Sequence, residues 1–148
     1  MRLKTARCIL HRQHPDSGER SYLLAVHASF RYRRQPRWGL VGGAIEWRES
    51  PRSAALRELH EELGIRLDDV IEIGDFRYKH GLHRVVAGEW SAAIPRVDRS
   101  ELLEVRWFER AEISALESER ALHANYELDA IDALERRLKE DATSRLAG

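Results

Sequence analysis

Residues 43–65, GAIEWRESPRSAALRELHEELGI, are the stretch of this sequence that decides its fold. A helix is predicted from about residue 51 to residue 63. Ser50 is a favourable N-cap, Pro51 suits the first helical position, and Gly64 suits the left-handed position beyond the last turn. At the start of the stretch, the pair Gly42-Gly43 permits a tight turn or a close approach of the backbone to a ligand. The stretch therefore predicts a glycine-containing connection that leads directly into a helix.

Three glutamates crowd one face of this predicted helix. Glu58, Glu61 and Glu62 stand at i, i+3 and i+4, so their side chains are neighbours on the helix surface. They lie in the C-terminal half, where the helix dipole disfavours negative charge, and Arg57 alone does not balance them. A divalent cation would balance them, because carboxylate oxygens are suitable ligands for Mg²⁺ and Mn²⁺. The alternative interpretation is a solvated acidic face.

The charged residues and glycines of the stretch follow one continuous pattern. With its spacings, the pattern is Gly43, five residues, Glu49, seven residues, Arg57, Glu58, Leu59, one residue, Glu61, Glu62, one residue, Gly64 and Ile65. It matches the Nudix box at every specified position, and the sequence therefore resembles a Nudix hydrolase. A motif with so many fixed identities is far more specific than a lone glycine-rich loop. Val41 stands where many members have proline, a departure that changes no chemical group.

The resemblance implies a role for each residue of the box. The metal ligands, which would bind Mg²⁺ or Mn²⁺ and also take part in catalysis, would be Glu58, Glu61 and Glu62. Arg57 and Glu49 would form a buried ion pair that locks the loop to the helix. Gly43 would keep the backbone close to the metal, and Gly64 completes the box.

Further candidate residues lie outside the glutamate cluster. In some Nudix proteins a loop glutamate completes the metal shell or serves as the base, and Glu101 fits this role best, with Glu104 second; surface charge is the alternative for both. Arg34 and Arg37 belong to the basic stretch RYRRQPR at residues 31–37, which either contacts substrate phosphates or is an ordinary solvated loop. Trp47 is interpreted as a core or pocket-wall residue that would contact the substrate, rather than as a base-stacking platform.

The rest of the chain predicts strands and helices around this helix. Strands are predicted at residues 4–11, 21–27, 70–78, 84–94 and 105–108, with short strands on either side of the glycine turn, and helices at 109–116 and 118–139. Ser118 would cap the last helix, which packs against the sheet or faces a partner in a homodimer. His80 and His83, in the turn KHGLH, are a base, a phosphate contact or incidental. This order fits the mixed β-sheet between helices of the Nudix α/β/α sandwich, whereas the pattern alone predicts an α/β or α+β layered domain.

Length and composition limit the class of protein. With 148 residues, the chain is predicted to form a single Nudix hydrolase domain over residues 1–148, with a flexible tail at 141–148. The 25 basic residues equal the 25 acidic residues, so DNA binding is not expected. The sequence has no apolar run long enough for a signal peptide or membrane span, which predicts a soluble cytoplasmic protein. Cys8, the only cysteine, excludes an intramolecular disulfide and is predicted to be buried in a strand.

The resemblance implies hydrolysis of a pyrophosphate bond in a nucleoside diphosphate linked to another group. A nucleoside triphosphate, a nucleotide sugar or a dinucleotide polyphosphate would be attacked by water at phosphorus, with divalent ions neutralising phosphate charge. One alternative is an enzyme that acts on the 5′ end of RNA. The other is a non-catalytic, nucleotide-binding regulatory module on a Nudix scaffold, against which the intact box argues. The sequence does not identify the substrate or the general base.

Overall fold

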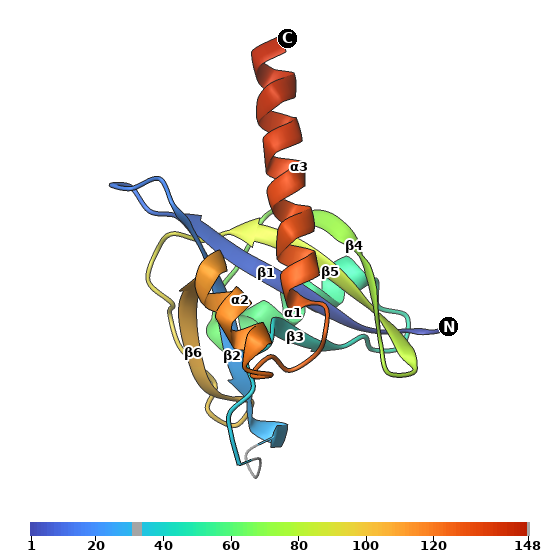
Figure 1. The fold of residues 1–148 in the computed structure, drawn as a ribbon. Coiled ribbons are helices and arrows are strands. Elements are labelled where there is room, and N and C mark those ends of the chain that lie inside the picture. The colour runs from blue at the N-terminus through green and yellow to red at the C-terminus, as the bar shows by residue number, and fades with distance from the viewer. Residues whose placement is uncertain (31–33, 148) are drawn as a thin grey trace.

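A computed structural model of the protein, which describes residues 1–30 and 34–147, contains one mixed β-sheet with helices on both faces (Figure 1). The strands are β1 (Leu3–Gln13), β2 (Arg20–His27), β3 (Val41–Ala44), β4 (Ile71–Tyr78), β5 (Gly81–Glu89) and β6 (Leu102–Glu109). The helices are α1 (Pro51–Leu63), α2 (Arg110–Ser118) and α3 (Glu127–Ala147), with a short 3₁₀ turn at Ala28–Phe30. The mixed sheet between helices predicted from the sequence is confirmed.

Strand β1 is the centre of the sheet. The strand order is β4-β5-β1-β2-β6, and β3 also pairs with β1. β1 runs parallel to β5, whereas it is antiparallel to β2 at residues 11–13 and to β3 at residues 5–8. β3 therefore lies beside the N-terminal half of β1, where Gly42 pairs with Arg7 and Gly43 with Ala6.

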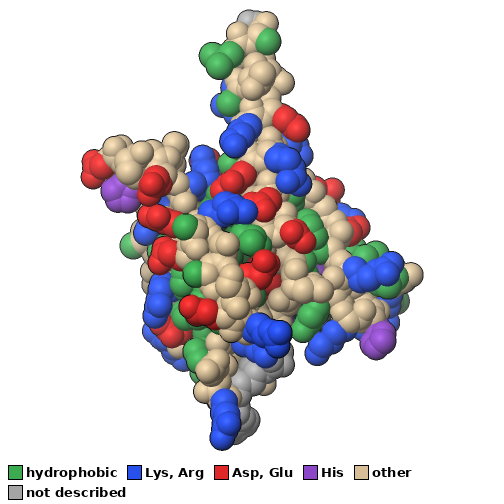
Figure 2. Space-filling model, viewed as in Figure 1, with side chains coloured by type: hydrophobic (Ala, Val, Ile, Leu, Met, Phe, Trp, Pro, Cys, Tyr) green, Lys and Arg blue, Asp and Glu red, His purple; other side chains and the backbone are tan. Residues whose placement is uncertain are grey.

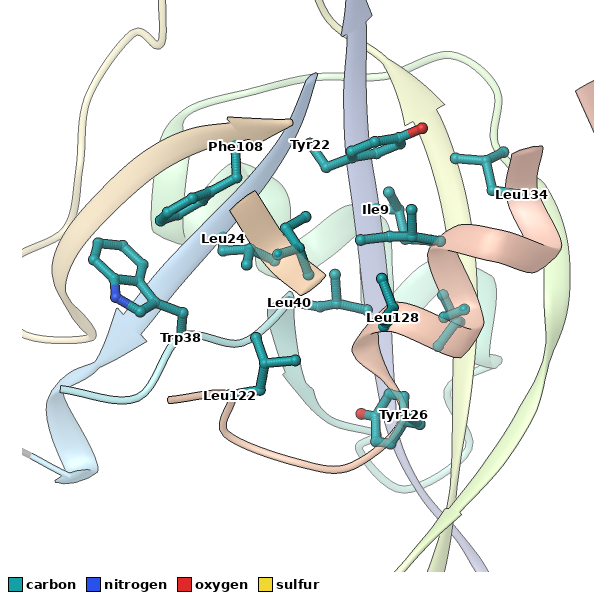
Figure 3. Close-up of a cluster of buried hydrophobic side chains, with 14 of the residues drawn as sticks. Ile9, Tyr22, Leu24, Trp38, Leu40, Phe108, Leu122, Tyr126, Leu128 and Leu134 are labelled. Carbon is teal, nitrogen blue, oxygen red and sulfur yellow. The ribbon is translucent and has the colours of Figure 1, made fainter. Parts of the chain in front are cut away.

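The two faces of the sheet carry separate cores. Along β1, Ala6, Cys8 and Leu10 pack in the cluster that includes the buried face of α1, while Ile9 belongs to the opposite cluster. This alternation is what a strand buried on both faces requires. Figure 3 shows the second cluster, in which side chains from the sheet meet side chains of α3 and of the segment before it. The C-terminal turns of α3 project beyond the sheet (Figure 1).

Several predicted boundaries are close to those observed. The helix predicted at 51–63 has these bounds, and the strands predicted at 4–11, 21–27 and 70–78 correspond to β1, β2 and β4. The strand predicted at 84–94 instead runs from Gly81 to Glu89, because Tyr78 already pairs with Gly81 and only Lys79 and His80 remain in the turn. The strand predicted at 105–108 is longer, since β6 pairs with β2 over residues 102–109.

The prediction of one helix from 118 to 139 is wrong at both ends. Ser118 is the last residue of α2, and Arg120 adopts a left-handed φ of 57° that stops the helix there. Leu122 and Tyr126 do contact the core, but from the irregular segment before α3. α3 continues through Ala147, so residues 141–147 are helical, and Gly148 lies outside the described residues. The flexibility of residues 141–148 stays a prediction.

One of the two alternatives for the glycine pair and one of those for Trp47 are wrong. Gly42 and Gly43 lie within β3 and do not form a turn. On their N-terminal side, Trp38 and Gly39 make only isolated bridges. Trp47 is 84% exposed, so it does not belong to the core, and its contact with the substrate stays a prediction. No helix in residues 1–30 and 34–147 is long and apolar enough to cross a membrane.

Candidate active site

Helix α1 holds the glutamates against β3. At its start, the Ser53 N–H donates to Ser50 Oγ at 3.1 Å, and at its end Gly64 has a left-handed φ of 70°. Between these caps, Ala55, Leu59 and Leu63 are buried against the sheet. The helix therefore has a fixed rotation about its axis, which sets the direction of each glutamate.

Glu62 points into the protein. Only 2% of it is exposed, and its Oε1 accepts a hydrogen bond from the Gly42 N–H at 3.0 Å. Burial, and next the charge of Glu58, raise the Glu62 pKa to about 8. Glu62 forms no ion pair with a described residue, and the Gly42 N–H and the charge of Arg7 offset the effect of burial only in part.

Glu58 and Glu61 both contact the same guanidinium nitrogen. Arg57 Nη1 lies 3.0 Å from Glu58 Oε1 and 3.2 Å from Glu61 Oε2. Burial raises the pKa of Glu58 above its ordinary value despite this contact. Glu58 also touches the backbone of β3, because a Cβ on Gly43 would lie 2.6 Å from Glu58 Oε1. The glycine thus permits the close approach of backbone and carboxylate.

Arg57 joins the loop after β3 to α1. Its Nε and Nη2 bind the two carboxylate oxygens of Glu49 at 2.8 and 2.9 Å, and its Nη2 also donates to the Ala44 carbonyl at 3.1 Å. The pair is partly buried. A two-point contact of this kind fixes the orientation of the guanidinium group as well as its distance from the carboxylate.

The chemistry of these donors fits a divalent cation, since carboxylates are hard oxygen ligands. Glu58 lies beside the buried Glu62, and the pKa values of both carboxyl groups are raised. A bound cation would stabilise their charged forms. Within residues 1–30 and 34–147, no three His, Cys, Asp or Glu side chains are gathered as a ready metal site. Instead, Glu58 and Glu61 face Arg57, and Glu62 faces Gly42.

Glu101 is held near the glutamates of α1 by backbone hydrogen bonds. The Asp98 N–H donates to the Glu62 carbonyl at 2.8 Å, and the Ala28 N–H donates to the Glu101 carbonyl at 2.8 Å. The negative charge of Glu101 contributes to the raised pKa values of Glu58 and Glu62. Glu104, the second choice from the sequence, instead pairs with Arg106 on β6 at 2.8 Å.

Arg7 is a site residue that sequence reasoning missed. Its Nη1 donates to the Gly42 carbonyl at 2.8 Å, so Gly42 is held by Arg7 on one side and by Glu62 on the other. Burial raises the pKa of Glu62 and of Tyr126, and the charge of Arg7 offsets part of each rise. A signal existed in the sequence, because Arg7 is a charge among the apolar residues of the predicted strand 4–11.

A set of rings and one buried acid lies on the α3 side of the sheet. His83 contacts Thr5 Oγ1 through Nδ1 at 2.6 Å and stacks on Tyr126, whereas His80 is exposed.

Glu127 is only 1% exposed. Its Oε2 accepts from the Ala124 N–H at 2.7 Å, and its Oε1 has no hydrogen-bond partner among the described residues. Burial raises the pKa of Glu127 to about 7.

The remaining predicted substrate contacts are not gathered with the glutamates. Arg34 and Arg37 line surface hollows together with Arg120, while residues 31–33 of the same basic stretch lie outside the described residues. Trp47 extends into solvent, with the Arg48 guanidinium 4.3 Å from the centre of its ring.

Solved structures with the same fold include several Nudix proteins. The NUDIX domain of Shewanella oneidensis NrtR, complexed with ADP ribose, has a TM-score of 0.72 and 18% identity, covering 93% of this chain and 89% of that chain. A NUDIX hydrolase from Nitrosomonas europaea has a TM-score of 0.68 and 18% identity, covering 89% and 87%. The MutT NUDIX hydrolase from Burkholderia pseudomallei has a TM-score of 0.53 and 25% identity, covering 72% and 84%.

Sequence comparisons lead to the same family. A nucleoside triphosphate pyrophosphatase/Nudix hydrolase fusion protein from Bifidobacterium longum is 36% identical over 73 residues, which are 49% of this chain. The chain spans only 15% of the length of that relative. The family model of the NUDIX domain matches residues 1–129. Since this match covers most of the sequence, the chain belongs to the Nudix hydrolase family.

Proposed function

We propose that this protein is a metal-dependent pyrophosphohydrolase that cleaves a nucleoside diphosphate linked to another group by attack of water on phosphorus. The observation that carries the proposal is the contact of Glu58 and Glu62 with the glycine backbone of β3. A phosphate-cleaving site needs such a fixed array of oxygen ligands beside an open backbone. Nudix hydrolases generally use divalent metal ions, which supports the same assignment.

Glu58, Glu61 and Glu62 would hold Mg²⁺ or Mn²⁺. When bound, such an ion neutralises phosphate oxygens and lowers the pKa of a coordinated water. Arg57 contacts both Glu58 and Glu61 and keeps their side chains on one side of α1. Gly43 leaves room for the Glu58 carboxylate, where any side chain would displace it.

We assign the proton acceptor to Glu101, with the glutamates of α1 as the alternatives. Glu101 is exposed, so its carboxylate is accessible to water, and its backbone is tied to the residues around α1. A carboxylate near the reacting water is a suitable general base. Replacing Glu101 with Gln should therefore lower kcat more than it changes KM.

The substrate class we propose is a small nucleotide: a nucleoside triphosphate, a nucleotide sugar or a dinucleotide polyphosphate. The ADP ribose bound by the Shewanella oneidensis NrtR domain, a nucleoside diphosphate linked to a sugar, supports this class. We further propose that the enzyme is cytoplasmic and binds neither membrane nor DNA. A homodimer stays a prediction, which gel filtration tests.

The test is hydrolysis of a substrate panel with Mg²⁺, Mn²⁺ or chelator. The panel contains nucleoside triphosphates, nucleotide sugars, dinucleotide polyphosphates and 5′-triphosphate RNA. We expect metal-dependent turnover of one nucleotide class, lost by about 100-fold or more in Glu62→Gln and Glu61→Gln, as for groups that stabilise the transition state. Glu140→Gln, the same change at an exposed residue of α3, is the matched control and should retain the rate.

Each other result would support a different assignment. An unchanged rate in either glutamine variant would remove that glutamate from the mechanism. Turnover of 5′-triphosphate RNA alone would select the RNA alternative. A folded protein that binds divalent metal and nucleotide but hydrolyses none of the panel would support the non-catalytic binding module.

A further inference from the structure

Three arginines from two distant segments line neighbouring hollows on the surface. Arg34, Gln35, Arg37 and Arg120 line a hollow of about 400 Å³, and we call these four residues the arginine basin. An adjoining hollow of about 380 Å³ shares Arg37 and Arg120, and its other lining residues are Glu117, Leu122, Ala124 and Asn125. Figure 2 shows Lys and Arg side chains at the end of the molecule opposite the projecting turns of α3.

The charges of the basin are not compensated. None of its three arginines has a side-chain hydrogen bond or an ion pair with another described residue. By contrast, Arg57 and Arg110 pair with Glu49 and Asp132. Among the described residues that line the two hollows, Glu117 is the one acidic residue, and it belongs to the adjoining hollow. Three neighbouring cations repel one another, and an anion bound between them would remove that repulsion.

The backbone of the fold builds this arrangement. The Trp38 N–H donates to the Ala121 carbonyl at 2.8 Å, and the His123 N–H donates to the Trp38 carbonyl at 2.7 Å. Both Trp38 and Leu122 are buried beside this contact. Arg37 and Arg120, which directly precede the paired residues, are therefore brought to the same place by the core.

Arg120 occupies a backbone position that favours glycine. It follows the end of α2, where the Arg120 N–H donates to the Glu117 carbonyl and the Ala121 N–H donates to the Leu116 carbonyl. This is the Schellman arrangement, whose left-handed residue is usually glycine. Glycine is more stable than arginine at a φ of 57°. The backbone conformation therefore does not explain why residue 120 is an arginine.

The basin lies within reach of the glutamates. Gly43, which touches Glu58, is the sixth residue after Arg37. Even a fully extended chain of that length spans at most about 22 Å between the two Cα atoms. One extended nucleotide could thus contact both places.

We propose that the arginine basin binds a second phosphate-bearing part of the substrate, beyond the pyrophosphate bond that is cleaved. Guanidinium groups bind phosphate oxygens through paired N–H donors, so phosphate is the ligand that the basin fits. The inference rests on the proposed function for its link to turnover. Among the substrate classes named above, the inference favours molecules that carry phosphate groups in addition to the two joined by the cleaved bond.

Binding of inorganic tripolyphosphate in the presence of chelator tests the basin without requiring turnover. We expect the Arg37→Gln/Arg120→Gln double variant to bind about tenfold or more weakly in calorimetry, since charge-assisted hydrogen bonds are lost. Arg145→Gln, a single charge change at the far end of α3, should bind as the wild type does. The proposal would be overturned if all three proteins bound tripolyphosphate with equal affinity, or if Arg145→Gln lost as much affinity as the double variant.

Arg120→Gly separates a binding role from a structural one. Glycine suits the left-handed position, so the melting temperature should stay the same or rise while tripolyphosphate affinity falls. A purely structural arginine would give unchanged affinity, which would contradict the proposal.

Turnover tests the link to the substrate. For a dinucleotide polyphosphate, the double variant should raise KM about tenfold with kcat unchanged, as when binding common to substrate and transition state is lost. An unchanged KM for every hydrolysed substrate would refute that link. If no substrate is hydrolysed but the affinity difference remains, the proposed function fails while the anion-binding basin stands.

Discussion

At the scale of single residues, the neighbouring glycines 42 and 43 meet different surroundings. A Cβ on Gly42 would lie 2.2 Å from the Ala6 carbonyl oxygen, and Gly42 has a φ of 130°. A Cβ on Gly43 would meet the end of the Glu58 side chain, which can rotate away. The first glycine is therefore required by the fold, and the second by the position of a carboxylate.

Replacing each glycine with alanine should separate stability from activity. Gly42→Ala should lower the free energy of unfolding by about 3 kcal/mol or more, because the backbone must move and adopt a strained φ. Gly43→Ala should cost no more than about 1 kcal/mol but reduce turnover by about 100-fold, as a displaced catalytic group does. Urea unfolding and the hydrolysis assay measure the two effects. Similar losses of stability in both variants would contradict this division.

Glu127 should make stability depend on pH. Its folded pKa of about 7 lies above its ordinary value of 4.5 because burial disfavours the charged form. The folded state then holds the proton more tightly than the unfolded state, so stability falls as the pH rises from about 4.5 to 7. The loss is of the order of 3 kcal/mol, at about 1.4 kcal/mol per pKa unit.

Glu127→Gln should remove the part of this dependence that Glu127 contributes, because glutamine imitates the neutral acid and can keep the hydrogen bond from Ala124. Glu62, whose pKa is also raised, keeps its own part. Urea unfolding at pH 5, 6, 7 and 8 measures the difference between the two proteins. The variant should be the more stable protein at pH 8, and the two should approach each other toward pH 5. Parallel pH profiles would show that Glu127 is not the titrating group.

At the scale of elements, local signals and tertiary contacts explain different parts of the structure. The bounds of α1 were predictable because Ser50, Pro51 and Gly64 mark its ends locally. The irregular segment between α2 and α3 was not predictable, since Arg120 gives no sign in the sequence of its left-handed φ. Leu122 and Tyr126 have helical spacing but pack through the irregular segment, whose course depends on the distant Trp38.

The same contrast holds for the candidate site. Its glutamates follow from one continuous motif, so their spacing on one helix was visible in the sequence. Arg7 was not identified, because its contact with Gly42 depends on the pairing of β1 with β3. The arginine basin was only half visible, since Arg120 comes from a segment far from residues 34–37.

The projecting end of α3 should contribute little to stability. Its buried residues end at Leu134, and Leu146 is almost fully exposed. Removing residues 140–148 should change the free energy of unfolding by no more than about 1 kcal/mol, because helical propensity alone adds little. Leu134→Ala, the reference variant, should cost about 2–5 kcal/mol. A larger effect of the truncation than of Leu134→Ala, in urea unfolding, would assign a packing role to the last turns.

At the scale of the whole molecule, β1 joins the two cores. It lies between β5 and the strands β2 and β3, and its alternate side chains reach both faces of the sheet. Disrupting the core on either face of the sheet should therefore disturb β1, which also contributes side chains to the core on the other face. We expect residues 1–147 to unfold as one cooperative unit, as small domains usually do.

Cys8 provides a chemical probe of that cooperativity. It is the only cysteine, lies on β1 with no exposed surface, and has a pKa raised to about 12 by burial. A thiol reagent attacks the thiolate, so the native protein should react only when β1 becomes accessible. If opening is global and faster than reaction, the labelling rate measures the free energy of unfolding.

The glycine variants then give the decisive comparison. Gly42→Ala, expected to lose about 3 kcal/mol, should speed the labelling of Cys8 by about 150-fold, whereas Gly43→Ala should speed it no more than about fivefold. Cys8→Ala, which cannot react, controls for reagent consumption. Rapid labelling at one rate in the wild type and both variants would mean that the α1 face opens on its own. The two cores would then not be coupled through β1, and the single cooperative unit would be refuted.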